Sequence, residues 1–185
     1  MTSDAHAVTV RDARPDERAA IRELTLRAYA EYATHMAPTA WEGLERAVRA
    51  ALASEERARD AVADAIVAER GGALVGSVLL YPPAADAYGG LAGRVSWPEV
   101  RLLAVAPEAR GLGIGRVLMD ECVRRARRVG ARELGLHTSE SMGAARRLYA
   151  RMGFVRTPEH DFRPDGAELV EAYRLRLDDP RPDRR

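Results

Sequence analysis

The residues best suited to chemistry are three glycines, Gly111, Gly113 and Gly115, which lie between an apolar run and a helical pattern. The first N–H groups of a helix have no intrahelical partner, and the helix dipole places partial positive charge there. Glycine lacks the Cβ atom that would keep an anion away from these groups, and Arg110 and Arg116 flank the loop with permanent charge. We therefore expect this loop to bind a phosphate-bearing ligand.

The spacing of the glycines separates the known classes of phosphate loop. The dinucleotide-binding fingerprint places its last two glycines three residues apart, whereas a single residue separates Gly113 from Gly115. A P-loop would continue with Gly-Lys-Ser or Gly-Lys-Thr, and neither follows here. Both nucleotide-binding classes are therefore disfavoured.

Three segments in a fixed order resemble the GNAT superfamily of acyl-CoA-dependent N-acyltransferases. They are Leu103-Ala104-Val105-x-Pro107, then Arg110-x-x-Gly113-x-Gly115, then Ala145-x-x-Leu148-Tyr149-x-x-x-Gly153-Phe154. The resemblance implies that acetyl-CoA is the co-substrate, and that the residues holding it are Leu103, Ala104, Val105, Arg110, Gly111, Leu112, Gly113, Ile114, Gly115 and Arg116. One departure is Met142, which stands where many members carry an Asn that helps to hold the cofactor.

The resemblance also implies two catalytic residues. An amine with a reference pKa of about 10.4 is protonated at neutral pH, so a base must remove a proton before it attacks a thioester. Glu99, at the start of the central strand, is the implied base, and its alternative is a carboxylate paired with Arg101 or exposed to solvent. Tyr149 is implied to lie against the coenzyme A sulfur and to protonate the leaving thiolate; its alternative is a tyrosine of the core.

The acceptor pocket is expected in the more variable segments. In the family the first two helices commonly shape it, which makes Tyr29, Tyr32, His35 and Trp41 candidate contacts, although each could simply pack helices together. Residues 82–98 are rich in Pro, Gly and Ala and are interpreted as a mobile loop near the acceptor entrance, with a plain surface loop as the alternative. Three loop acids, Asp86, Glu159 and Asp161, could attract a cationic acceptor.

The periodicity of the apolar residues predicts the elements that must position these groups. Strands are expected at 8–11, 61–69, 74–81, 100–106, 133–138, 154–155 and 168–177, with a Gly71-Gly72 hairpin turn. Helices are expected from Pro15, around 41–52, over 114–129 and over 142–152, the last capped by Ser139 or Ser141. The resemblance implies a GNAT fold of mixed α/β type, with a mostly antiparallel sheet of about six or seven strands, one parallel splayed pair and about four flanking helices.

Composition limits the remaining possibilities. A chain of 185 residues is long enough for one domain, expected to have an ordered core over 8–177 and a frayed tail over 178–185. The 29 basic residues are all Arg and alternate with acids, giving a net charge of +1, so a nucleic-acid partner is disfavoured. Arg124, Arg125, Arg127 and Arg128 are interpreted as a solvated helix face, and the alternative is contact with the ribose phosphate of coenzyme A. No metal site is expected, because the histidines are scattered.

The cellular setting and the reaction follow as expectations. No apolar run of membrane length or secretion signal is evident, so a soluble cytoplasmic protein is expected, with a homodimer possible.

Cys122 lies among apolar helix positions and is expected to be a buried thiol rather than a nucleophile. We therefore expect direct transfer of an acetyl group from acetyl-CoA to a primary amine that the sequence does not identify. The alternatives are a non-catalytic acyl-CoA-binding module and the transfer of a longer acyl group.

Overall fold

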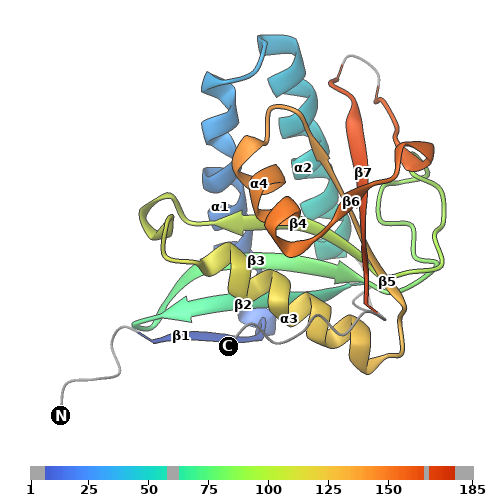
Figure 1. The fold of residues 1–185 in the computed structure, drawn as a ribbon. Coiled ribbons are helices and arrows are strands. Elements are labelled where there is room, and N and C mark those ends of the chain that lie inside the picture. The colour runs from blue at the N-terminus through green and yellow to red at the C-terminus, as the bar shows by residue number, and fades with distance from the viewer. Residues whose placement is uncertain (1–6, 58–62, 165–166, 178–185) are drawn as a thin grey trace.

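The computed structural model describes residues 7–57, 63–164 and 167–177, which contain one mixed sheet (Figure 1). Its strands lie in the order β1-β2-β3-β4-β5-β7-β6. They are β1 (Val8–Asp12), β2 (Asp64–Arg70), β3 (Ala73–Tyr81), β4 (Glu99–Val105), β5 (Glu133–Ser139), β6 (Val155–Arg156) and β7 (Val170–Arg176). β4 and β5 are parallel, and all other neighbouring strands are antiparallel. The predicted sheet with one parallel pair is confirmed.

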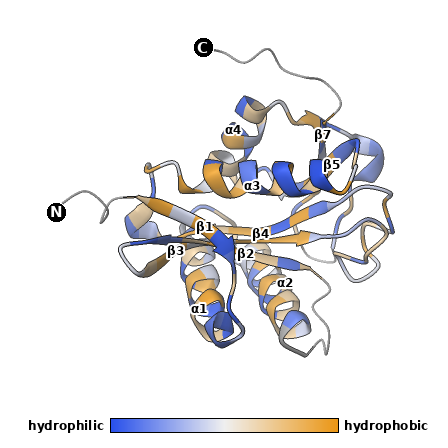
Figure 2. Ribbon diagram, turned by 90° about the horizontal axis from the view of Figure 1, so that it is seen from below, coloured by the Kyte–Doolittle hydropathy of each residue, from blue (hydrophilic) through white to orange (hydrophobic). Residues whose placement is uncertain are grey.

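Helices cover both faces of this sheet. They are α1 (Arg18–Tyr29), α2 (Pro38–Arg57), α3 (Ile114–Arg128) and α4 (Gly143–Met152). Figure 2 shows α1 and α2 on one face of the sheet and α3 and α4 on the other. Within the described residues, no helix combines the length and the apolar character needed to cross a membrane.

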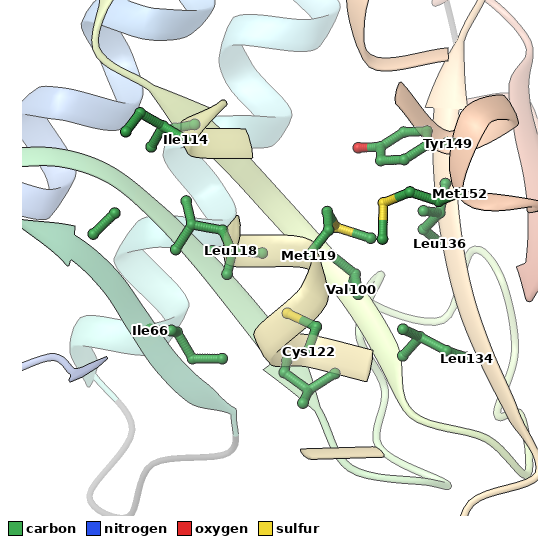
Figure 3. Close-up of a cluster of buried hydrophobic side chains, with 14 of the residues drawn as sticks. Ile66, Val100, Ile114, Leu118, Met119, Cys122, Leu134, Leu136, Tyr149 and Met152 are labelled. Atoms are coloured by element: carbon green, nitrogen blue, oxygen red, sulfur yellow. The ribbon is translucent and has the colours of Figure 1, made fainter. Parts of the chain in front are cut away.

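The core between α3 and the sheet follows from the helical spacing of its apolar residues. Ile114, Leu118 and Cys122 recur every four residues and are at most 1% exposed, and Figure 3 shows them in the buried cluster. Gly76 on β3 lets the helix approach closely, because a Cβ there would lie 2.7 Å from Cγ2 of Ile114. This packing fixes the start of α3 against β3.

A bulge in β4 separates the two parallel strands. Leu102 has a φ of +53°, and the pairing of β4 with β3 shifts beside it, between Ser77 and Leu79. β4 pairs with β5 only through Glu99 opposite Gly135 and Val100 opposite Leu136. The strands then part, as predicted, and leave a gap at the centre of the sheet.

Some local expectations are wrong. Pro15 begins a short 3-10 turn, and α1 itself starts at Arg18. The residue before α4 is Met142, and no side chain caps that helix: Ser139 ends β5, and Ser141 donates a hydrogen bond to Glu168 instead. The predicted tail over 178–185 lies outside the described residues, as do residues 61 and 62 of the predicted second strand.

Arg125 is also placed differently from the expected solvated face. It is only 8% exposed, because its position on α3 turns it toward the strands beneath the helix. Its guanidinium pairs with Asp12 at 2.6 Å, Asp64 at 3.1 Å and Glu121 at 2.8 Å. Arg125 therefore joins α3 to β1 and β2.

Candidate active site

A groove of about 390 Å³ runs from the glycine loop along β4. Nine of the residues predicted to hold the cofactor line it: Leu103, Ala104, Val105, Arg110, Gly111, Gly113, Ile114, Gly115 and Arg116. The tenth, Leu112, is not among the lining residues and is 50% exposed. Arg151 on α4 also lines the groove, and the sequence analysis did not predict it as a cofactor contact.

The glycine loop has the form of an anion cradle. Gly111 and Gly113 have φ values of +74° and +78°, and apart from the glycine and its chain neighbours no described atom lies within 4 Å of the position that a Cβ would take at either residue. Gly113 is the residue before α3, so the first N–H groups of that helix open onto the groove. The loop therefore fits a phosphate group approaching the helix N-terminus.

The two arginines of the loop are held in partly exposed ion pairs. Arg110 pairs with Glu31 and donates to the carbonyl oxygen of Ala28 at 3.2 Å, while Arg116 pairs with Asp120 at 2.8 Å. Exposed ion pairs of this kind contribute only about 0–1 kcal/mol. Exchange of a carboxylate partner for a phosphate would therefore cost little.

A second cavity, of about 150 Å³, adjoins the groove at the centre of the sheet. Tyr29, Tyr32, Leu103 and Ala145 line both spaces. The second cavity lies where β4 and β5 part, since Arg101 to Leu103 and His137 to Ser139 are among its walls. A molecule in the groove can thus meet a molecule in the cavity.

Tyr149 on α4 lines the second cavity and is 6% exposed (Figure 3). Its ring packs against Phe154, with the ring centroids 5.8 Å apart. Burial raises the pKa of its hydroxyl above the ordinary value, so the group keeps its proton at neutral pH. A buried, protonated hydroxyl group therefore belongs to a residue of the cavity wall.

Glu99 lies behind the cavity wall rather than in it. It is 4% exposed and accepts a hydrogen bond from Nε1 of Trp97 at 3.0 Å. Its other carboxylate oxygen lies 3.2 Å from Nδ1 of His137, and it is His137, not Glu99, that lines the cavity. Gly135 makes this arrangement possible, because a Cβ there would collide with the Glu99 carboxylate and the Trp97 ring.

The predicted acceptor contacts divide into two groups. Tyr29 and Tyr32 line the cavity. His35 is exposed at the end of a 3-10 turn, and Trp41 lines a separate small cavity between α1 and α2, so neither lies among the described walls of this one. Trp41 thus packs between the two helices, which was the alternative to acceptor contact in the sequence analysis.

Several cavity residues were missed by the sequence analysis. Tyr88 comes from the loop expected near the acceptor, and its ring lies 4.7 Å from His137 and 5.3 Å from Phe162. The guanidinium of Arg101 stacks 4.6 Å from the centre of the Tyr88 ring. Apart from the loop that contains Tyr88, no local pattern distinguished these residues, which come together from separate elements.

Among the described residues, the acid in the cavity wall is Glu168, and the three loop acids proposed from the sequence lie elsewhere. Asp86 accepts hydrogen bonds from the backbone of its own loop, Asp161 pairs with Arg156 at 2.7 Å, and Glu159 lies 3.4 Å from Arg174. None of the three is a lining residue of the cavity. The expectation that they attract the acceptor is therefore not supported by their positions.

Comparison with solved structures places this fold among acetyltransferases. The chain superimposes on yncA of Salmonella typhimurium, solved with its cofactor acetyl-CoA, with a TM-score of 0.64 and 24% identity over 97% of this chain and 100% of that one. It also superimposes on a GNAT acetyltransferase of Brucella melitensis in complex with acetyl-CoA, with a TM-score of 0.56 and 23% identity over 96% and 92% of the two chains. These similarities show a shared fold.

Curated relatives are similar over shorter stretches. The mycothiol acetyltransferase of Geodermatophilus obscurus is 45% identical over 58 residues, which are 31% of this chain and 19% of that protein. The enzyme of the same name from Cellulomonas flavigena is 37% identical over 93 residues, which are 50% of this chain and 26% of that protein. The chain thus matches about a fifth to a quarter of the length of these relatives.

The family itself is shown by a match over most of the chain. The sequence pattern of the acetyltransferase (GNAT) family covers residues 19–154, from the start of α1 to the end of α4 and the Phe154 that follows it. This range includes the glycine loop, the bulged strand and Tyr149. The protein therefore belongs to the GNAT family of acetyltransferases.

Proposed function

We propose that this protein transfers the acetyl group of acetyl-CoA directly to a primary amine. The observation that carries the proposal is the junction of the two cavities, which share Leu103 and Ala145 as walls while Tyr149 lies in the second. A phosphate-bearing molecule held at the glycine loop can extend along β4 and reach the space that would hold an acceptor. Acetyl-CoA, which structural neighbours bind, would supply the acetyl thioester there.

The chain contributes binding groups along the whole groove. The cradle of Gly111 and Gly113 offers backbone N–H groups to the pyrophosphate, and Arg110 and Arg116 offer charge. The edge of β4 that lines the groove is free of β5 beyond Val100, so its backbone can form strand-like hydrogen bonds to the pantetheine amides.

Tyr149 and Glu99 are the proposed catalytic residues. Tyr149 would donate its proton to the departing thiolate, since its protonated hydroxyl belongs to a side chain in the wall of the second cavity. Glu99 would take the proton of the amine. Since its carboxylate lies behind His137, the proton must pass through that imidazole or a water molecule.

A covalent route through the chain's cysteine is disfavoured by position. Cys122 is fully buried on α3, and burial raises the pKa of its thiol to about 12. The nucleophilic form of cysteine is the thiolate, which is scarce at neutral pH when the pKa is so high. This supports direct transfer from the donor to the amine.

The acceptor is not carried over from the mycothiol acetyltransferases, because those matches cover at most half of this chain. The proposal is tested by measuring coenzyme A release from acetyl-CoA with a panel of aliphatic amines, polyamines, amino acids, aminoglycosides and peptides. Release that depends on an amine, with the acetylated amine identified by mass spectrometry, is the expected result. Acetyl-CoA binding without release for any acceptor would favour a non-catalytic binding module.

A further inference from the structure

Three polar side-chain atoms in the second cavity, which is the proposed acceptor cavity, lack hydrogen-bond partners among the described residues. They are Oε2 of Glu168, Oγ of Ser139 and Oγ1 of Thr138, all buried and without a partner in the described part of the chain. Ser139 is 6% exposed and Thr138 is 3% exposed, and all three residues line the cavity. Because a buried polar atom without a partner destabilises a fold by about 1–3 kcal/mol, groups of this kind usually serve a ligand or a water molecule.

Two of these groups are brought to the same cavity from β5 and from the segment just before β7. β5 and β7 pair Ser139 with Val170, and Glu168 precedes Val170 by two residues. Ser139 and Glu168 both line the cavity. Ser141 donates to Oε1 of Glu168 at 2.5 Å, which fixes one carboxylate oxygen and leaves Oε2 for another donor.

Most of the remaining cavity wall is apolar or aromatic. Tyr29, Tyr32, Tyr88 and Phe162 contribute rings, and Leu44 and Val48 contribute aliphatic surface from α2. Such walls can bind the apolar part of an acceptor molecule, and the faces of aromatic rings attract a cation. Arg101 also lines the cavity, so a second positive charge on the acceptor would be repelled there.

We propose that Glu168 binds the ammonium group of the acceptor, and that the acceptor is a compact monoamine with an apolar or aromatic body. This inference rests on the function proposed above and narrows its acceptor class. A carboxylate only accepts hydrogen bonds, whereas an ammonium has three N–H donors, enough for Oε2 of Glu168 and the hydroxyl of Ser139. The Coulomb attraction between the two charges is also stronger in a low-dielectric cavity than in solvent.

The first test measures binding alone, so it does not depend on turnover. Protein saturated with coenzyme A is titrated in a calorimeter at pH 7 with 2-phenylethylamine, with its neutral analogue 2-phenylethanol and with spermidine. The expected result is that 2-phenylethylamine binds at least about tenfold more tightly than the alcohol and more tightly than spermidine. Equal affinity for amine and alcohol, or a preference for spermidine, would contradict the proposal.

Glu168→Gln identifies the residue responsible. This variant should lose the preference for the amine over the alcohol, while Glu168→Asp should keep part of it because the charge remains. Glu159→Gln is the matched control, since its carboxylate is 58% exposed and outside the cavity. Thermal melting of each variant identifies loss of fold, and a folded Glu168→Gln protein that still prefers the amine would overturn the assignment.

Kinetics then separate this proposal from the proposed function. With an amine that wild-type protein acetylates, Glu168→Gln should raise the KM for that amine about 10- to 100-fold and leave kcat within a few-fold of wild type. A fall in kcat at unchanged KM would contradict the binding role and indicate proton transfer. Selective amine binding without coenzyme A release would support the recognition site and contradict the acetyltransferase function.

Discussion

The imidazole of His137 links the carboxylate of Glu99 to the backbone of the neighbouring loop. Its Nδ1 lies 3.2 Å from Oε2 of Glu99, and its Nε2 lies 3.0 Å from the carbonyl oxygen of His160. Both ring nitrogens of His137 therefore face oxygen atoms, and the imidazole connects the proposed base, Glu99, to the segment that contains His160.

Glu99→Gln should impair the chemical step while leaving cofactor binding intact. The amide can keep the contact with Trp97 but cannot hold the proton of the amine, so kcat should fall by about 100-fold or more. Steady-state kinetics across pH and calorimetry with acetyl-CoA measure the two effects. Glu45→Gln on α2, whose carboxylate pairs with Arg49 at the surface, is the control. A wild-type kcat in Glu99→Gln would contradict the role of base.

Gly113→Ala should weaken acetyl-CoA binding because its methyl group would enter the anion cradle. Gly130, which follows α3 at its other end, offers a matched control: its φ is +74°, against +78° at Gly113, and both sites have open space at the Cβ position. Both substitutions should lower the free energy of unfolding by about 1–2 kcal/mol, since an alanine is strained at positive φ. Only Gly113→Ala should raise the Kd for acetyl-CoA. Equal Kd values for the two variants would show that the loop does not contact the cofactor.

Stability should fall in acid partly through Glu121. The hydrogen bond from Arg124, with a further one from Arg125, lowers the pKa of Glu121 from 4.5 to about 2. A carboxylate whose pKa is lower in the folded state adds stability above its unfolded pKa, and this contribution is lost as the pH falls from about 4.5 toward 2. Glu121→Gln should therefore lose about 1–3 kcal/mol of unfolding free energy at pH 7 and show a shallower decline in acid. Urea unfolding at several pH values measures this, with the more exposed Asp120→Asn as control. Parallel pH curves for Glu121→Gln and wild type would refute it.

The parts that local sequence could predict are those governed by spacing within one segment. Gly113 and the apolar residues of α3 belong to a single stretch, and their positions follow from helix geometry and the needs of an anion. The parallel pair and its splay were predicted from the family resemblance. The bulge beside the splay was not predicted, because leucine, the residue at position 102, does not favour a positive φ.

The acceptor cavity could not be predicted because its walls come from distant segments. Tyr88, His137 and Phe162 pack together from a loop, from β5 and from the segment before β7. Arg125 appeared to belong to a surface stripe, but its partners Asp12 and Asp64 belong to strands far from it in sequence. Such contacts depend on tertiary packing, which short-range periodicity does not encode.

The most direct test of the account compares Tyr149→Phe with Tyr173→Phe. Tyr149 lines the acceptor cavity, whereas the hydroxyl of Tyr173 donates to Glu171 at 3.0 Å and Tyr173 lines neither cavity. With an accepted amine, coenzyme A release by Tyr149→Phe should fall by about 100-fold in kcat while its Kd for acetyl-CoA stays at the wild-type value. Tyr173→Phe should retain wild-type turnover. A Tyr149→Phe protein that releases coenzyme A and forms acetylated amine at the wild-type rate would contradict the proposed acid and the site built around it.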